Sequence, residues 1–109
     1  MFMSPEMKVL TLYIGTSQPG AKEKVVALIS QRFASFTVIS GDGYFRGIPE
    51  PMWFVRIATD KPLRVVETAE ALRSALKQET VGIDFEGRYY TCTAENPAAN
   101  LKKILEPSW

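Results

Sequence analysis

The chain contains no histidine and only one cysteine, and these two shortages exclude several classes of chemistry. Without histidine it lacks the usual general base near neutral pH, and His-dependent triads and His-ligated metal sites are impossible. Cys92 cannot form an internal disulfide. It lies in a predicted strand without a histidine partner, so we expect a buried structural thiol rather than a nucleophile. We therefore favour a non-enzymatic protein, with no catalytic residue, metal or cofactor, over an enzyme.

Long apolar runs and an excess of one charge are also missing. No run approaches the roughly 20 apolar residues that a membrane span needs, and residues 1–7 have no basic region or cleavage site of a signal peptide. We expect a cytoplasmic protein without membrane contact, in which residues 1–7 are a flexible extension and 107–109 a tail. The 13 Lys+Arg and 12 Asp+Glu leave a net charge of +1. That charge gives no overall attraction to nucleic acid, which we do not expect as a partner.

The remaining composition is that of one globular domain, which we place at residues 8–106: 46% of the 109 residues are apolar and 23% charged. Hydrophobic alternation and helical stripes predict an ordered series of elements. The predicted strands cover 8–15, 37–40 with a continuation over 44–47, 52–59, 81–85 and 88–93. The predicted helices cover 21–36, 63–78 and a last segment that opens at Asn96 and Pro97.

This order, β-α-β-β-α-β-β-α, begins with the split βαβ pattern of ferredoxin-like proteins. The fold class is therefore α+β: a ferredoxin-like two-layer sandwich, with an antiparallel sheet and helices mainly on one face. The other face must be exposed to solvent, covered by the last helix, or buried in an oligomer. Ile48–Pro51 is expected to be a connector, because prolines lack the donor that a central strand needs. Gly41–Gly43 is expected to be a turn or bulge, and Glu86–Gly87 a hairpin turn.

The segment Gly41–Trp53 is the richest in groups that bind ligands. Arg46 could grip a phosphate or carboxylate through two parallel hydrogen bonds, while Tyr44 and Trp53 could stack a ring beside it. Glu50 supplies a carboxylate. The structural alternative is a hairpin loop whose aromatic residues cap the core and whose Arg46–Glu50 ion pair is exposed and of little energetic worth.

A second candidate is the loop 15–20, which leads into a helix N-terminus. Free N–H groups at such an end bind anions, and Thr16 and Ser17 lie in this loop. The spacing is not that of a P-loop, and the loop can equally be a plain connector. The hypothetical ligand-binding residues are thus Tyr44, Arg46, Glu50, Trp53, Thr16 and Ser17.

Two further groups have simpler interpretations. Arg88, Tyr89 and Tyr90 could stack bases on a sheet face, as in four-stranded RNA-binding domains, but the characteristic motif of such domains is missing and strand packing explains the tyrosines. Asp84 and Glu86 alternate on one predicted strand and could share a divalent ion. They are more typical of the solvent face of an edge hairpin.

Four segments together resemble a known group of proteins: TLYIGTS, FTVISGDGYFRG, the step through Pro49–Pro51 into WFVRIAT, and ALRSALKQETV. Over roughly residues 10–83 the chain is similar to an uncharacterised family of small bacterial ferredoxin-like proteins of unknown function. The resemblance implies a fold and no activity.

Three functions remain open on these residues. The first is a non-enzymatic binding or regulatory module that takes a small anionic or aromatic ligand. We expect it to assemble through its sheet as a homodimer or higher homo-oligomer, because the strands 8–15 and 52–59 are apolar on both faces. The second is a small isomerase or lyase that uses Arg46 as the electrophile and Glu50 or Asp42 as the base. The third is a protein-binding accessory factor.

Overall fold

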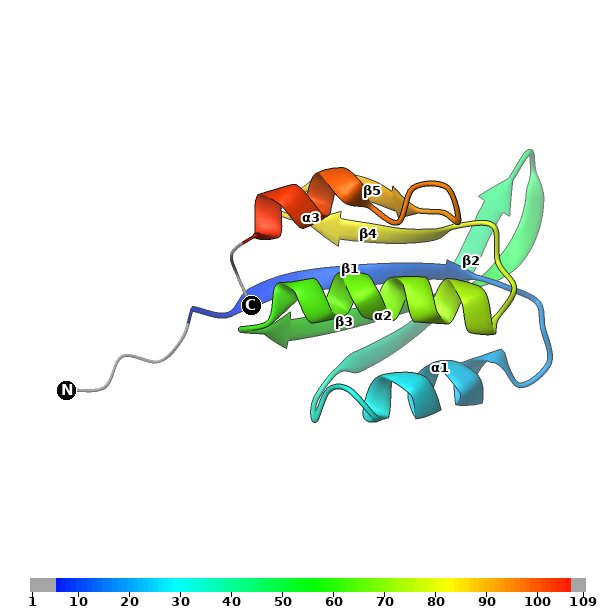
Figure 1. The fold of residues 1–109 in the computed structure, drawn as a ribbon. Coiled ribbons are helices and arrows are strands. Elements are labelled where there is room, and N and C mark those ends of the chain that lie inside the picture. The colour runs from blue at the N-terminus through cyan, green and yellow to red at the C-terminus, as the bar shows by residue number, and fades with distance from the viewer. Residues whose placement is uncertain (1–5, 107–109) are drawn as a thin grey trace.

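The computed structural model describes residues 6–106 and shows an α+β chain with a five-stranded antiparallel sheet and three helices (Figure 1). The elements follow the expected order, β-α-β-β-α-β-β-α. Their bounds are β1 Lys8–Gly15, α1 Ala21–Ser30, β2 Thr37–Phe45, β3 Ile48–Thr59, α2 Pro62–Ala75, β4 Val81–Phe85, β5 Arg88–Cys92 and α3 Ala99–Leu105. The expected N-terminal extension and C-terminal tail lie largely outside the described residues, at 1–5 and 107–109.

The strands stand in the order β2-β3-β1-β4-β5, and every neighbouring pair is antiparallel. The central strand β1 alternates between its two faces, as a strand with a period of two must. Leu10, Leu12 and Ile14 are fully buried on the helix side, whereas Thr11 and Tyr13 on the other side are only half-buried. The core therefore lies on one side of the sheet.

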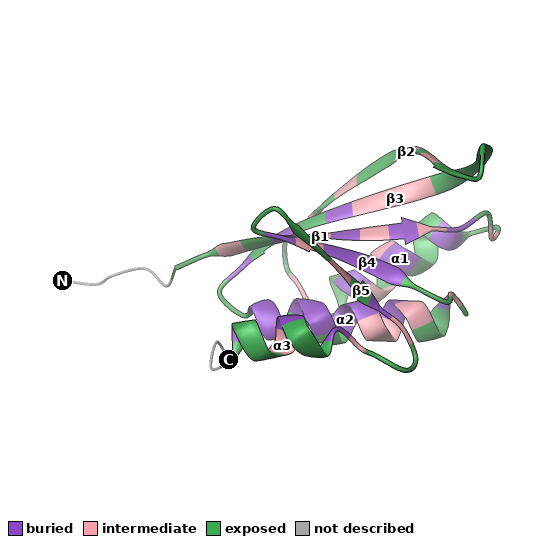
Figure 2. Cartoon of the chain, turned by 90° about the horizontal axis from the view of Figure 1, so that it is seen from above, coloured by how far each residue is buried: buried purple, intermediate pink, exposed green. Residues whose placement is uncertain are grey.

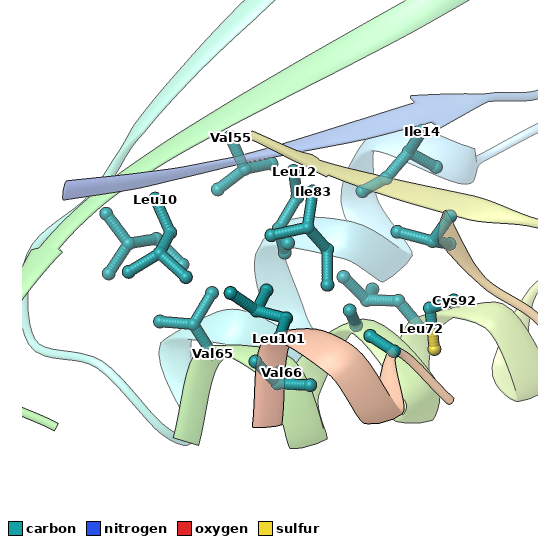
Figure 3. Packing of buried hydrophobic residues seen from close by; sticks show 14 of the residues in the cluster. Leu10, Leu12, Ile14, Val55, Val65, Val66, Leu72, Ile83, Cys92 and Leu101 are labelled. Carbon is teal, nitrogen blue, oxygen red and sulfur yellow. The ribbon is translucent and has the colours of Figure 1, made fainter. Parts of the chain in front are cut away.

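All three helices cover that same side, as the view along the sheet shows (Figure 2). Leu101 and Leu105 of α3 belong to the core cluster. Leu101 lies beside Val66 of α2 (Figure 3). The last helix therefore does not cover the opposite face, which was one of the three expectations for that face. Within residues 6–106, no other helix or strand packs against it.

All three predicted helices have different bounds in the structure. Helix α2 covers Pro62–Ala75 rather than residues 63–78, and Lys77, soon after its end, has a positive φ of 54°. Helix α1 ends at Ser30 rather than at residue 36, because the N–H groups of Arg32 and Phe33 both donate to the carbonyl of Ile29 and tighten the last turn. Helix α3 begins at Ala99 rather than at Pro97, after Ala98 adopts a left-handed conformation. The Asn96 side chain still accepts a hydrogen bond from the N–H of Ala99, at 3.0 Å.

The predicted connector Ile48–Pro51 is wrong, because these residues form the first third of β3. In the ladder they pair with β2 alone, because the pairing with β1 starts at Met52, which lies opposite Gly15. On the β1 side the Pro51 carbonyl accepts a hydrogen bond from the N–H of Thr16, at 3.0 Å. Prolines are tolerated here because no ladder on that side requires a donor from them. The expected turn or bulge at Gly41–Gly43 is also wrong, since β2 runs through it in regular register.

The β2–β3 turn lies instead at Arg46 and Gly47, whose φ angles of 53° and 77° are both positive. Glu86 and Gly87 repeat this geometry with φ angles of 52° and 77°, which confirms the hairpin turn expected there. Because β2 and the start of β3 pair only with each other, their hairpin projects beyond the rest of the sheet (Figure 1). No helix within residues 6–106 is long and apolar enough to cross a membrane.

Candidate functional site

A row of aromatic rings crosses the uncovered face of the sheet. The ring of Tyr13 on β1 meets Phe54 on β3 at 5.2 Å between centroids and Tyr89 on β5 at 5.5 Å, both edge-to-face. Tyr89 can reach Tyr13 across β4 because Gly82 lies between them. A Cβ atom at Gly82 would collide with the Tyr89 ring. The missing side chain of Gly82 thus brings the two tyrosines together.

One end of this row opens into a hollow of about 560 Å³, which we call the open-face hollow. Its floor lies close to the β1 backbone, because Gly15 has no side chain: a Cβ atom there would lie 2.6 Å from Oε1 of Glu50 and 2.7 Å from the sulfur of Met52. The Glu50 carboxylate therefore lies directly over β1. The lining consists of Tyr13, Gly15, Gly43, Tyr44, Phe45, Glu50, Met52, Gln78, Glu79, Thr80, Gly82 and Tyr89.

The lining of the open-face hollow is aromatic and acidic. Four aromatic residues and two carboxylates, Glu50 and Glu79, contribute to it, and no lysine or arginine is among its residues. Ring faces and carboxylates both attract cations, and ring faces also stack on planar ligands. An anion would meet two like charges here. The arrangement can therefore hold a small molecule that combines a flat ring with a positive charge.

Of the six residues proposed from the sequence, Tyr44 and Glu50 line this hollow. Arg46 does not, because it occupies the hairpin turn, with its guanidinium carbon 5.1 Å from the centre of the Phe45 ring. The Arg46–Glu50 ion pair is not formed among the described residues, whose two ion pairs are Lys8–Glu6 and Arg73–Glu70. In the β2–β3 hairpin, Glu50 therefore lines the hollow, whereas Arg46 lies at the exposed tip.

The other three, Thr16, Ser17 and Trp53, line a separate hollow of about 250 Å³ at the start of α1. The Thr16 hydroxyl accepts a hydrogen bond from the N–H of Gln18 and is used in the local turn. The Nζ of Lys22 lies 5.9 Å from the Trp53 ring, and Nε1 of Trp53 is buried without a hydrogen-bond partner. Trp53 of the first candidate segment therefore lies with the second candidate, the loop 15–20, and apart from Tyr44 and Glu50.

Most of the lining of the open-face hollow was not predicted from the sequence. Tyr13 and Met52 could have been found by counting alternate positions along the two central strands. Met52 lies opposite Gly15, two residues after Tyr13 on β1, so their side chains are on the same face. Glu79 and Thr80 belong to the α2–β4 loop. Glu79 and Thr80 come to the same hollow as the β2–β3 hairpin through long-range strand pairing, which no local sequence pattern predicts.

Cys92 is fully buried, as expected, and belongs to a polar network that the sequence did not indicate. Its thiol donates to Oε2 of Glu70 at 3.1 Å, and Glu70 also accepts two hydrogen bonds from Arg73, at 2.7 and 3.0 Å. The bonds from Arg73 lower the pKa of Glu70 to about 2. Burial and the neighbouring Glu70 raise the pKa of Cys92 to about 12. The thiol is therefore protonated and unreactive at neutral pH.

The remaining candidates are separated by the strand period. Tyr89 is exposed on the open face, whereas Tyr90 packs against the core on the other. The two tyrosines therefore cannot form a common stacking surface. Glu86 lies in the turn beyond β4 and does not continue the strand face of Asp84. Within residues 6–106, no three Cys, Asp or Glu side chains are grouped to hold a metal ion.

No protein-family profile matches the chain, and no curated protein is similar to it in sequence. A solved structure with a similar fold is that of a phage SAM lyase in the apo state. The two superpose with a TM-score of 0.62 over 80% of this chain and 89% of that one, with 19% sequence identity. At this identity the likeness shows a shared fold.

Proposed function

We propose that the chain binds a small molecule carrying both a flat ring and a positive charge in the open-face hollow. The observation that carries this proposal is the composition of the lining: aromatic rings and two carboxylates, with no basic residue. Of the two ligand classes expected from the sequence, this lining favours the aromatic one. Because its charged residues are both carboxylates, we propose a cationic ligand in place of the anionic ligand expected from the sequence.

S-adenosylmethionine is the first ligand to test. It carries an adenine ring, which an aromatic side chain can stack, and a sulfonium cation, which a carboxylate or ring face attracts. The fold shared with a phage SAM lyase supports this choice. Because Glu50 is exposed to solvent, we expect its attraction for the sulfonium to be worth about 1 kcal/mol, a factor of about five in affinity.

The ferredoxin-like assignment and assembly through the sheet belong to the same proposal. The sheet order β2-β3-β1-β4, with both crossovers through helices on one face, supports the assignment. Assembly is supported by the exposed apolar side chains of the open face and hairpin tip. Their exposed fractions reach 54% at Ile39 and 71% at Phe45. A second copy on this face would cover these side chains and close the mouth of the hollow.

A lyase activity on the same ligand is the second candidate, favoured by the fold likeness and by the position of Glu50 over β1. A lyase splits one substrate without water or an external oxidant, so orientation of the substrate can supply much of the rate. A reaction that depends mainly on substrate orientation suits a chain without histidine, because it needs no general base of that kind. Glu50 would be the carboxylate nearest the reacting group. Arg46 takes no part in this version, because it does not line the hollow.

Titration calorimetry with two ligands tests the binding proposal. S-adenosylhomocysteine has the same ring but a neutral thioether, so the ratio of the two affinities isolates the sulfonium charge. We expect S-adenosylmethionine to bind more tightly, and Glu50→Gln to remove most of that preference. Glu67→Gln, an exposed carboxylate on the helix side of the sheet, is the matched control and should leave it intact. No detectable heat with either ligand would refute the proposal.

Mass spectrometry separates the two candidate functions and tests the assembly. After incubation with S-adenosylmethionine, a binding module returns the ligand unchanged, whereas a lyase converts many equivalents into two smaller products. Native spectra of the same samples report the oligomeric state. A monomer that carries no ligand would favour the third function, a protein-binding accessory factor.

A further inference from the structure

A short segment of the α2–β4 loop forms a wall between two hollows. Gln78, Glu79 and Thr80 line the open-face hollow and also line a second hollow of about 610 Å³ on the helix side, which includes Arg73 and Lys77. We call residues 78–80 the wall. Glu79 and Glu50 are the two carboxylates that line the open-face hollow. The position of the wall therefore sets the distance between the Glu79 and Glu50 charges.

The wall is attached to the end of α2 through one residue. The chain leaves the helix at Lys77 with a positive φ of 54°, and the N–H of Gln78 then donates to the carbonyl of Arg73 at 2.9 Å. Nη1 of Arg73 donates back to the carbonyl of Gln78, at 3.2 Å. Both backbone groups of Gln78 are therefore bonded to Arg73.

Arg73 is itself held in place from the core. Its Nε and Nη2 donate to the two oxygens of Glu70, and Glu70 accepts the buried thiol of Cys92 on β5. The Arg73 side chain is only 16% exposed. A continuous set of hydrogen bonds thus runs from β5 through Glu70 and Arg73 to the wall. A planar guanidinium can make all three of its bonds at once, which a lysine ammonium at the end of a flexible stem cannot reproduce.

We propose that Arg73 is a positioning residue for the ligand of the open-face hollow, because it holds the wall that carries Glu79. This proposal rests on the proposed function. Arg73 does not line the open-face hollow and acts only through Gln78. A wall without this bond would sample several positions, and the ligand would have to order it on binding, at a cost in affinity.

The test compares Arg73→Lys with Arg64→Lys, an exposed arginine of the same helix that receives the same substitution. Hydrogen exchange of the ligand-free proteins measures the wall directly. We expect the amides of residues 78–80 to exchange faster in Arg73→Lys and those of β1 to be unchanged. Calorimetry with S-adenosylmethionine should show about fivefold weaker binding, as expected when the ligand must order roughly one additional side chain on binding. Arg64→Lys should change neither.

Cys92→Ala provides a second variant that removes the inner end of the network. It should move both readouts in the same direction by less, and it keeps the proposal testable if Arg73→Lys does not fold. Unchanged exchange at the wall in the folded variants would overturn the proposal, as would a loosened wall with full affinity. Failure of the wild-type protein to bind S-adenosylmethionine would instead refute the proposed function. The exchange data would still show whether Arg73 orders the wall.

Discussion

The two faces of the sheet are built from the same strands and differ in almost every other respect. On the helix side, β1 contributes Leu10, Leu12 and Ile14, all fully buried. On the open side the same strand contributes Tyr13 and Gly15, which meet other aromatic rings and a carboxylate. Neighbours along one strand therefore have separate tasks. The aliphatic face stabilises the fold. The open face has aromatic rings beside a hollow that forms because Gly15 has no side chain, and a ligand site needs both features.

The contrast should be largest in the reactivity of thiols on β5. The pKa of Cys92 rises from its ordinary value of 9.0 to about 12, which lowers its thiolate fraction at neutral pH about a thousandfold. We expect the native protein to resist iodoacetamide until it is unfolded. In the double variant Cys92→Ala/Thr91→Cys, the thiol moves one residue to the exposed face and should label at an ordinary rate, as mass spectrometry would show. Rapid labelling of native Cys92 would contradict the burial of that face.

The next largest difference is expected in stability. Leu12→Ala removes a fully buried side chain from the core and should lower the free energy of unfolding by about 3 kcal/mol. Thr11→Ala, the adjacent position on the open face, should lower it by less than about 1 kcal/mol. Urea denaturation of both variants measures the difference. Equal losses would mean that the open face is as tightly packed as the core.

A smaller effect is expected where the open face is closely packed. Gly82→Ala places a Cβ atom against the Tyr89 ring, and the ring must move away from Tyr13 at a cost of about 1 kcal/mol. In a Tyr89→Ala background the same change should become neutral or stabilising, because glycine is unfavourable inside a strand. Denaturation of the four proteins gives the coupling. An equal loss in both backgrounds would show that Tyr89 does not lie over Gly82.

The smallest expected effect concerns pH. The pKa of Glu70 is lowered from 4.5 to about 2, mainly by its hydrogen bonds from Arg73. A depressed carboxyl pKa contributes stability that is present above 4.5 and lost as the pH falls through 2. Solvent screening at the half-exposed Glu70 reduces that contribution. Glu70→Gln should therefore be less stable than the wild type at neutral pH, and the gap should close in acid. A gap that does not change with pH would contradict the ionised network.

Much of the fold could be predicted from the sequence, because strands with a period of two and helices with an amphipathic stripe are local patterns. The errors fall where long-range pairing overrides a local rule. Pro49 and Pro51 argue against a central strand, yet they stand in β3 because β1 is too short to pair with them. The candidate site was predicted less well. Tyr44 and Glu50 line the open-face hollow, whereas Arg46 and Trp53, which were grouped with them from the sequence, do not.

The sequence by itself determined the element order, the burial of Cys92 and the exclusion of histidine chemistry, since these depend on composition and on patterns within one segment. Only the tertiary structure decided which face of the sheet stayed uncovered and that Glu79 and Glu50 line the same hollow. The physical reason is that both depend on how the strands pair. Register brings together residues far apart in the chain, and no local property of either residue encodes the partner.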